Sequence, residues 1–263
     1  MRASNFQTAV LSEPGGREAN EDSCLWDEVG ESACWVVADG LGGHNGGELA
    51  SKTATSAIIA SFKHNPEVSN AALDQHFIAA HNAMLACQKE NPALADMRST
   101  AVALLSDSRN ALWGHVGDSR LYWFKPRGLV MQTEDHSVPQ ALVKAGDLSP
   151  DRIRGHTDRN RLLRSLGQPG AVHPAILESP QALFSVDAFL LCTDGFWESV
   201  LETEMLADLV ASASPQEWLK RSESRLMARA LSRGDNYSAI AIFVSPTTAE
   251  SAHLAAQPLQ GTA

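Results

Sequence analysis

The feature that most constrains the fold of this chain is a succession of short apolar runs separated by tight polar turns. Strands that follow one another across short turns pair in antiparallel fashion. The runs that we interpret as strands cover residues 34–38, 100–105, 111–116, 120–124, 129–133, 188–192 and 237–244. The sequence therefore predicts a protein rich in antiparallel sheet.

Pairs of helices interrupt these strands. Asn45 is a candidate N-cap, and Glu48 completes a capping box. The two apolar stripes that follow at helical spacing are Ala50, Ala54, Ala57, Ile58 and Phe62, and then Leu73, Phe77, Ala80, Met84 and Cys87. A second pair is expected over 202–211 and from Ser214-Pro215 to about Leu231. Because runs of strands alternate with runs of helices, we expect an α+β fold, a four-layer α-β-β-α sandwich with two central antiparallel sheets flanked by helix pairs.

The length and charge of the chain limit what it can be. Its 263 residues fit one large domain, which we place at residues 1–245, followed by a small, polar and disordered tail at 246–263. The net charge of −10 argues against a nucleic-acid partner, which would need a basic face. We find no signal peptide and no apolar run long enough to span a bilayer. The four cysteines include no Cys-x-x-Cys pair, which is typical of reduced thiols and not of a zinc site. We expect a cytoplasmic monomer without a membrane partner.

Three aspartates stand where predicted strands begin or end. Asp39 precedes a glycine-rich turn that opens with Gly40, Asp194 follows another apolar run, and Asp235 comes shortly before the last one. Carboxylates combined with a backbone carbonyl suit a hard divalent cation. Each aspartate alone is better interpreted as a turn residue or a helix cap. Their joint occurrence favours a metal site.

Other polar motifs are weak when taken singly. Arg17 is suited to bidentate phosphate binding, and Glu21 and Asp22 could add oxygens, although the segment also fits an ordinary charged loop. Asp118 lies in a turn between two predicted strands, which fits either a hairpin or an additional metal ligand. In the tripeptide Asp135-His136-Ser137, the serine could cap a short helix, which is a purely structural role.

Taken in order, these motifs resemble those of the PPM (type 2C) family of metal-dependent protein serine/threonine phosphatases in its bacterial form. The matching segments are Arg17 to Asp22, Asp39 to Ser51, Ser99-Thr100, Gly117 to Tyr122, Asp135 to Ser137, Asn160 to Gly167, Thr193 to Gly195 and Asp235-Asn236. Any one motif is weak, whereas the ordered set, which spans roughly residues 5 to 244, is highly specific.

The resemblance implies a β-sandwich flanked by helices and a site for two Mn²⁺ or Mg²⁺ ions. By matching positions, Asp39 would bridge both ions and the Gly40 carbonyl would bind one of them. Asp194 and Asp235 would hold the other.

The same resemblance assigns the remaining residues. Glu21 and Asp22 match acidic positions near the metals, Asp118 matches the position of a third, weaker ion, and Arg17 matches the phosphate-binding arginine. A metal-bridging hydroxide would attack phosphorus in line with the departing serine or threonine oxygen. The implied substrate is a phosphorylated protein, and the implied role is to reverse a bacterial Ser/Thr kinase.

Two regions leave the assignment open. Leu41 stands where many eukaryotic members have a histidine proposed as general acid; His44 fits a helix cap better, so the acid is unassigned. Residues 144–164 resemble the variable flap of the family, and their five arginines fit either attraction of a phosphopeptide or a solvated loop.

Two other functions remain as alternatives. A small-molecule phosphomonoesterase would use the same site chemistry. A non-catalytic regulatory module of the same fold would be expected to lose the metal aspartates, all of which are present. The sequence does not name the pathway, and type VI secretion regulation is one alternative.

Overall fold

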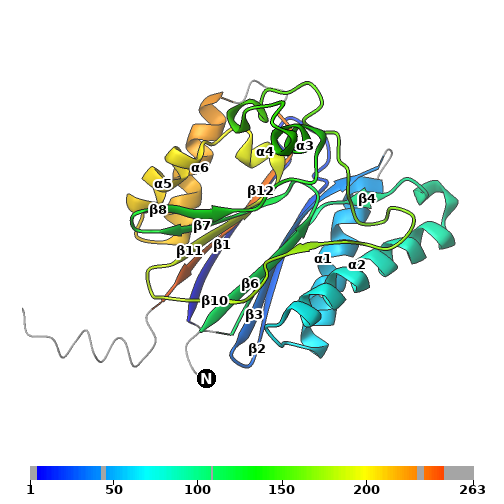
Figure 1. Cartoon of the computed structure of the whole chain (residues 1–263), viewed down its shortest axis with the longest axis horizontal. Coiled ribbons are helices and arrows are strands. Elements are labelled where there is room, and N and C mark those ends of the chain that lie inside the picture. Colours follow the sequence, from blue (N-terminus) through cyan, green and yellow to red (C-terminus); the bar gives the residue numbers. More distant parts are fainter. Residues whose placement is uncertain (1–4, 43–45, 108, 230–233, 246–263) are drawn as a thin grey trace, which may run out of the picture.

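The computed structural model describes residues 5–42, 46–107, 109–229 and 234–245, and two β-sheets packed face to face form its centre (Figure 1). The strands are β1 (Phe6–Glu13), β2 (Asp22–Val29), β3 (Ser32–Leu41), β4 (Arg98–Ser99), β5 (Ala101–Ser106), β6 (Asn110–Val116), β7 (Arg120–Lys125), β8 (Gly128–Gln132), β9 (Ala175–Ile176), β10 (Gln181–Ala182), β11 (Ala188–Cys192) and β12 (Tyr237–Val244). Sheet A has the order β1-β12-β11-β7-β8. Sheet B has the order β10-β6-β5-β3-β2, with β4 beside β3 and β9 beside β6. All strand pairs in the described residues are antiparallel.

Helices cover the outer face of each sheet (Figure 1). The α-helices are α1 (Gly46–His64), α2 (Asn70–Glu90), α3 (Val138–Ala145), α4 (Asp194–Trp197), α5 (Glu202–Val210) and α6 (Pro215–Arg229), and two short 3₁₀ helices are η1 (Pro92–Leu94) and η2 (Pro150–Arg152). The pair α1 and α2 packs on sheet B, and the pair α5 and α6 packs on sheet A. This arrangement confirms the predicted four-layer sandwich. None of the helices in the described part of the chain has both the length and the apolar character that a membrane span requires.

Three apolar layers hold the sandwich together, and β3 shows how the sequence builds them. Trp35 and Val37 point between the two sheets, where Phe189 and Ile240 of sheet A also lie. The intervening residues of β3 point to the opposite face and pack against α1 and α2. Successive side chains of a strand alternate between faces, so a strand buried on both sides reads as an unbroken apolar run. A third layer fills the space between sheet A and α5–α6.

The predicted strands agree with the observed ones to within three residues at each end, the largest difference being the end of β3, and 188–192 and 237–244 coincide with β11 and β12. Sequence reasoning did not delimit β1 and β2. Both are edge strands with many partly or fully exposed residues, so neither shows a continuous apolar run.

The predicted helices are also found. Ser214 begins α6 and its hydroxyl accepts a hydrogen bond from the Glu217 N–H (3.2 Å). In the stripes of α1 and α2, the predicted residues are buried except Ala57 and Cys87, which are partly buried. The expected cap Asn45, the last predicted residues of α6 at 230–231 and the tail at 246–263 lie outside the described residues.

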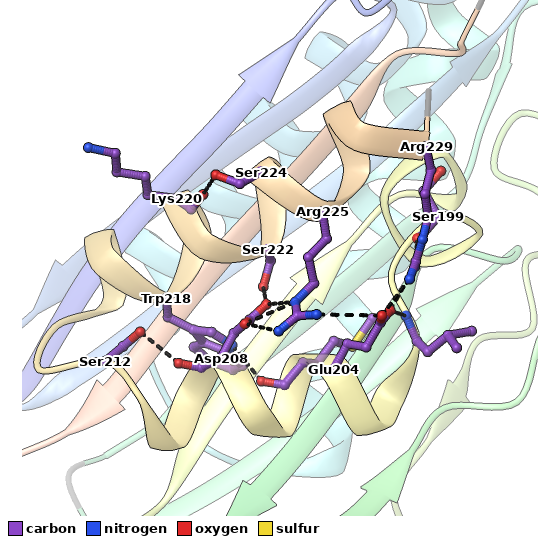
Figure 2. Close-up of polar contacts among 12 residues, drawn as sticks. Ser199, Glu204, Asp208, Ser212, Trp218, Lys220, Ser222, Ser224, Arg225 and Arg229 are labelled. Atoms are coloured by element: carbon purple, nitrogen blue, oxygen red, sulfur yellow. Dashed lines mark hydrogen bonds and ion pairs between the residues drawn. The ribbon is translucent and has the colours of Figure 1, made fainter. Parts of the chain in front are cut away.

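Polar side chains join α5 to α6 on the outside of sheet A (Figure 2). Arg225 of α6 binds both carboxylate oxygens of Asp208, with Nε 2.8 Å from Oδ2 and Nη2 2.8 Å from Oδ1. Near the end of α6, Arg229 pairs with Glu204 and donates to the carbonyl oxygen of Ser199 (2.6 Å). Because bidentate pairs of this kind fix geometry as well as charge, α5 is a rigid support for both the end of α6 and the segment that follows α4.

Candidate active site

The predicted aspartates gather at one end of the sandwich, because antiparallel pairing places the end of one strand beside the start of its neighbour. Asp39 near the end of β3 lies opposite Asp22 at the start of β2. β11 runs antiparallel to β12, so Asp194 after the first strand and Asp235 before the second lie at the same edge. Asp118 lies at that end too, in the turn from β6 to β7.

These side chains line a pocket of about 350 Å³. The predicted site residues that line it are Arg17, Glu21, Asp39, Gly40, Asp118, Asp194 and Asp235. Asp22 is the one predicted site residue that does not line it. The other lining residues are Leu41, Gly42, Asn160, Leu162 and Asn236.

The backbone of Asp39 is fixed by the dipeptide Ser99-Thr100. The Thr100 hydroxyl accepts from the Asp39 N–H (2.9 Å). The Asp39 carbonyl oxygen accepts from the Thr100 N–H and from the Ser99 hydroxyl, both at 2.9 Å. These bonds use main-chain atoms of Asp39, so its carboxylate is left to face the pocket.

A close approach of two backbones requires the glycine after Asp39. A Cβ at Gly40 would collide with the carbonyl oxygen of Gly47 in the first turn of α1. The Gly40 N–H donates to the carbonyl oxygen of Glu21 (3.0 Å). The start of α1, the end of β3 and the segment before β2 are thereby held together beside the pocket.

Arg17 lies at the open rim of the pocket. Its Nη2 donates to Oδ2 of Asp235 at 2.9 Å, and 58% of the Arg17 side chain is exposed. Asn236 holds the loop that carries it: the Asn236 amide nitrogen donates to two backbone carbonyls of the segment 14–19 (2.8 and 2.9 Å), and its oxygen accepts from the Glu21 N–H (2.8 Å). One buried amide therefore ties the arginine loop to the start of β12.

Asp22 lies behind the pocket. Its side chain is buried, and Oδ2 accepts a hydrogen bond from the Thr193 hydroxyl (2.9 Å). Burial raises the pKa of Asp22 to about 7, although hydrogen bonds from Ser238 and Thr193 act in the opposite direction. The structure thus places Asp22 where it links β2 to the residue before Asp194.

The pocket concentrates negative charge. Burial raises the pKa of Asp39 and of Asp194 well above its ordinary value, and neighbouring carboxylates raise both further. Burial, with the charge of Asp135, raises the pKa of Asp118 to about 7. Because ionised carboxylates that crowd together are unfavourable, a divalent cation among them would be strongly favoured.

The donor set fits a hard cation. It consists of carboxylate oxygens with a backbone carbonyl, which Mn²⁺ and Mg²⁺ prefer, and contains neither cysteine nor histidine. No three His, Cys, Asp or Glu side chains in the described residues already have the spacing of a closed metal site. The pocket therefore supplies suitable ligands without a preformed cage.

A buried cluster supports the turn that carries Asp118. Nε1 of Trp197 donates to the Asp118 carbonyl oxygen (2.9 Å). The guanidinium carbon of Arg120 lies 3.5 Å from the centroid of the Trp197 ring, and Arg120 binds both oxygens of Asp135 at 2.7 Å. Ser137 caps α3, as expected. The tripeptide 135–137 therefore has the structural role that its sequence suggested.

The five arginines of the flap fall into two groups. Arg154 pairs with Glu202 of α5 (2.6 Å), and Arg159 pairs with Glu198 at the end of α4 (2.8 Å). Both pairs hold the flap against the elements that follow Asp194. The exposed group consists of Arg152, Arg161 and Arg164. The sequence could not separate these groups, since their partners lie far away in the chain.

Sequence reasoning did not assign several pocket residues. Asn160 and Leu162 reach the pocket from the flap, and Asn236 lies beside Asp235. The available signal was their place in the matching motifs, because their residue types alone do not indicate a site. Leu41, which has no titratable group, lines the pocket, and His44 lies outside the described residues.

The comparison with protein families agrees with this geometry. The pattern of the family described as Protein phosphatase 2C matches residues 16–233. A curated relative, the serine/threonine phosphatase stp of Listeria welshimeri, is 30% identical over 195 residues, which cover 72% of this chain and 77% of the relative.

Solved structures give the same result. The crystal structure of the Mycobacterium tuberculosis serine/threonine phosphatase PstP/Ppp is similar with a TM-score of 0.81 and 27% identity, covering 92% of this chain and 99% of that one. The catalytic domain of a phosphatase PstP in complex with two manganese ions is similar with a TM-score of 0.77 and 27% identity, again covering 92% and 99%.

Proposed function

This chain belongs to the protein phosphatase 2C (PPM) family in its bacterial form, and from that membership we propose that it hydrolyses phosphoserine and phosphothreonine in proteins with the help of divalent metal ions. One observation carries the proposal: carboxylates from five separate parts of the fold line one pocket together with an exposed arginine. Metal-assisted phosphoryl transfer needs this combination of metal ligands and a cation for the phosphoryl group.

By matching positions in the family, the proposed metal ligands are Asp39, the Gly40 carbonyl, Asp194 and Asp235, which all line this pocket and would together hold the ions. The relative that holds two manganese ions supports Mn²⁺, and Mg²⁺ fits the same donors. Cations bound there would lower the pKa of an attacking water and offset charge on the phosphoryl oxygens.

Three further acidic residues surround this set. Glu21 and Asp118 line the pocket beside the proposed ligands, and Asp118 is the proposed ligand of a third ion. Asp22 does not line the pocket, and its carboxylate accepts a hydrogen bond from the Thr193 hydroxyl. We therefore propose that Asp22 acts mainly by holding β2 and the segment before Asp194 in register.

Arg17 is the proposed phosphate-binding residue. Its guanidinium has donors beyond the one engaged by Asp235, and it lies at the open rim where a phosphoryl group would enter. A guanidinium binds phosphate oxygens in bidentate fashion. The contact with Asp235 orients the arginine toward the same space that the carboxylates face.

Assays with two substrates test the proposal. Phosphate release should be measured from a phosphothreonine peptide and from p-nitrophenyl phosphate, with Mn²⁺ and with EDTA. We expect turnover of the peptide with Mn²⁺ and none with EDTA. Turnover of p-nitrophenyl phosphate without turnover of the peptide would favour the small-molecule phosphomonoesterase instead, and no Mn²⁺-dependent turnover of either would contradict an enzyme.

A matched pair of variants tests the site. Asp194→Asn should lower kcat by more than about 100-fold, since even partners that only orient metal ligands are worth 10- to 100-fold. Glu178→Gln removes an exposed carboxylate outside the pocket and should leave kcat unchanged. Full activity of Asp194→Asn would show that the metals are held elsewhere.

The kinase that this enzyme would oppose is proposed to be a bacterial Ser/Thr kinase.

A further inference from the structure

A cluster of charged and aromatic side chains lies beneath the flap, outside the pocket. Nη2 of Arg154 in the flap lies 2.6 Å from Oε1 of Glu202, and its guanidinium carbon lies 5.4 Å from the Trp197 ring centroid. The preceding residue, Ile153, is buried in the same apolar layer as Trp197. The flap is thus seated on α4 and α5 by an apolar side chain and an adjacent ion pair.

This seat is connected to the turn that carries Asp118. Trp197 contacts the flap arginine on its ring and donates from Nε1 to the Asp118 carbonyl oxygen. Arg120, two residues after Asp118, also lies over the Trp197 ring, and its Nη1 lies 3.9 Å from the same Glu202 oxygen that binds Arg154. A movement of the flap would therefore change contacts of the Trp197 ring and of the Glu202 carboxylate, both of which Arg120 shares.

The α5 side of this contact is rigid. Glu202 is the first residue of α5, and α5 is held to α6 by the pairs Glu204–Arg229 and Asp208–Arg225 (Figure 2). The flap side is held more weakly. Nη1 of Arg154 is buried but finds no acceptor among the described residues, and a buried donor without a partner is unfavourable. We therefore expect the flap, and not α5, to separate first when this contact is broken.

We propose that Arg154 is a positioning residue, which fastens the flap to α4 and α5 and, through Trp197, holds the turn of Asp118 in the geometry that a metal ion requires. The inference rests on the proposed function in one respect, that Asp118 is a metal ligand. Its other part, the attachment of the flap, does not depend on any activity.

Two variants and a matched control test the attachment. Arg154→Met and Glu202→Gln remove the ion pair from either side, and Arg152→Met removes an equal charge from an exposed flap residue that makes no ion pair with a described residue. Cleavage by trypsin after Arg161 is followed by mass spectrometry in EDTA. Cleavage depends on how often the flap opens, so we expect about a tenfold faster rate in the first two variants and no change in the control. Thermal melting shows that each variant is folded.

Calorimetric titration with Mn²⁺ tests the effect on Asp118. The weakest Mn²⁺ site should lose about tenfold in affinity in Arg154→Met and Glu202→Gln, as is typical when partners of metal ligands are removed. The double variant should be no worse than Glu202→Gln alone, because Glu202→Gln already removes the contact of Arg154, whereas Glu202 also lies 3.9 Å from Arg120. If Arg154→Met behaves like Arg152→Met in both measurements, the proposal is wrong. Faster cleavage with unchanged Mn²⁺ affinity would equally overturn the positioning role. Absence of phosphatase activity in the wild type would refute the proposed function while the cleavage comparison still decides the attachment.

Discussion

The buried ion pair between Arg120 and Asp135 allows the support of the site to be tested quantitatively. Both nitrogen–oxygen distances are 2.7 Å, and only 5% and 2% of the two side chains are exposed. Asp135→Asn keeps the shape of the side chain but leaves the Arg120 charge buried, with the Tyr122 hydroxyl at 3.2 Å and Glu202 at 3.9 Å as further neighbours. Removing one partner of a buried pair costs about 3–5 kcal/mol. Because Glu202 still compensates part of the charge, we expect about 3 kcal/mol.

Urea unfolding followed by circular dichroism measures this loss. EDTA should be present, so that metal binding does not contribute to the free energy of unfolding. A loss of about 3 kcal/mol corresponds to a fall in Tm of roughly 6–12 °C for a domain of this size. The control is the neighbouring residue: Glu134 pairs with Lys144 at 2.9 Å, but the two side chains are 62% and 60% exposed. Glu134→Gln should therefore cost less than about 1 kcal/mol.

Two results would refute this reasoning. The first is an Asp135→Asn protein as stable as Glu134→Gln, which would mean that the Arg120 charge is not kept away from solvent. The second concerns the double variant Arg120→Met/Asp135→Leu. It should be more stable than Asp135→Asn, because it removes the unpaired charge as well. A double variant that is less stable would show that packing, and not charge, dominates at this position.

Three further predictions concern the pocket. Arg17→Ala should raise KM for a phosphothreonine peptide more than it lowers kcat, and an unchanged KM would remove Arg17 from phosphate binding. Burial raises the pKa of Asp39 well above its ordinary value and raises that of Asp118 to about 7. Protons therefore compete with the metal ions for these carboxylates at low pH. The apparent Mn²⁺ affinity should therefore rise between about pH 6 and pH 8. At the lower pH, Mn²⁺ binding should release protons, which calorimetry in two buffers detects. An affinity independent of pH would contradict this prediction. Asn236→Ala breaks three hydrogen bonds to the backbone of the arginine loop and should cost about 1–3 kcal/mol in urea unfolding, whereas a neutral effect would show that the loop is held by other contacts.

The sequence determined the layers of the fold and the pieces of the site. Apolar runs such as that of β3 and the stripes of α1 and α2 are local patterns with fixed periods, so each element can be read without knowing its partners. Asp39, Asp194 and Asp235 could be placed at strand ends for the same reason. The edge strands β1 and β2 were not delimited, because many of their residues are partly or fully exposed and so form no continuous apolar run.

Only the tertiary structure decided how those pieces are used. Glu21 and Asp22 are adjacent acids in the sequence, yet one lines the pocket and the other is bound by Thr193, 171 residues away. The arginines of the flap look alike in the chain, and their separation into paired and exposed groups depends on α4 and α5. Arg17 meets Asp235 across 218 residues. Such contacts follow from the packing of whole strands and helices, so no local pattern carries them, and the chemistry of this site depends on them.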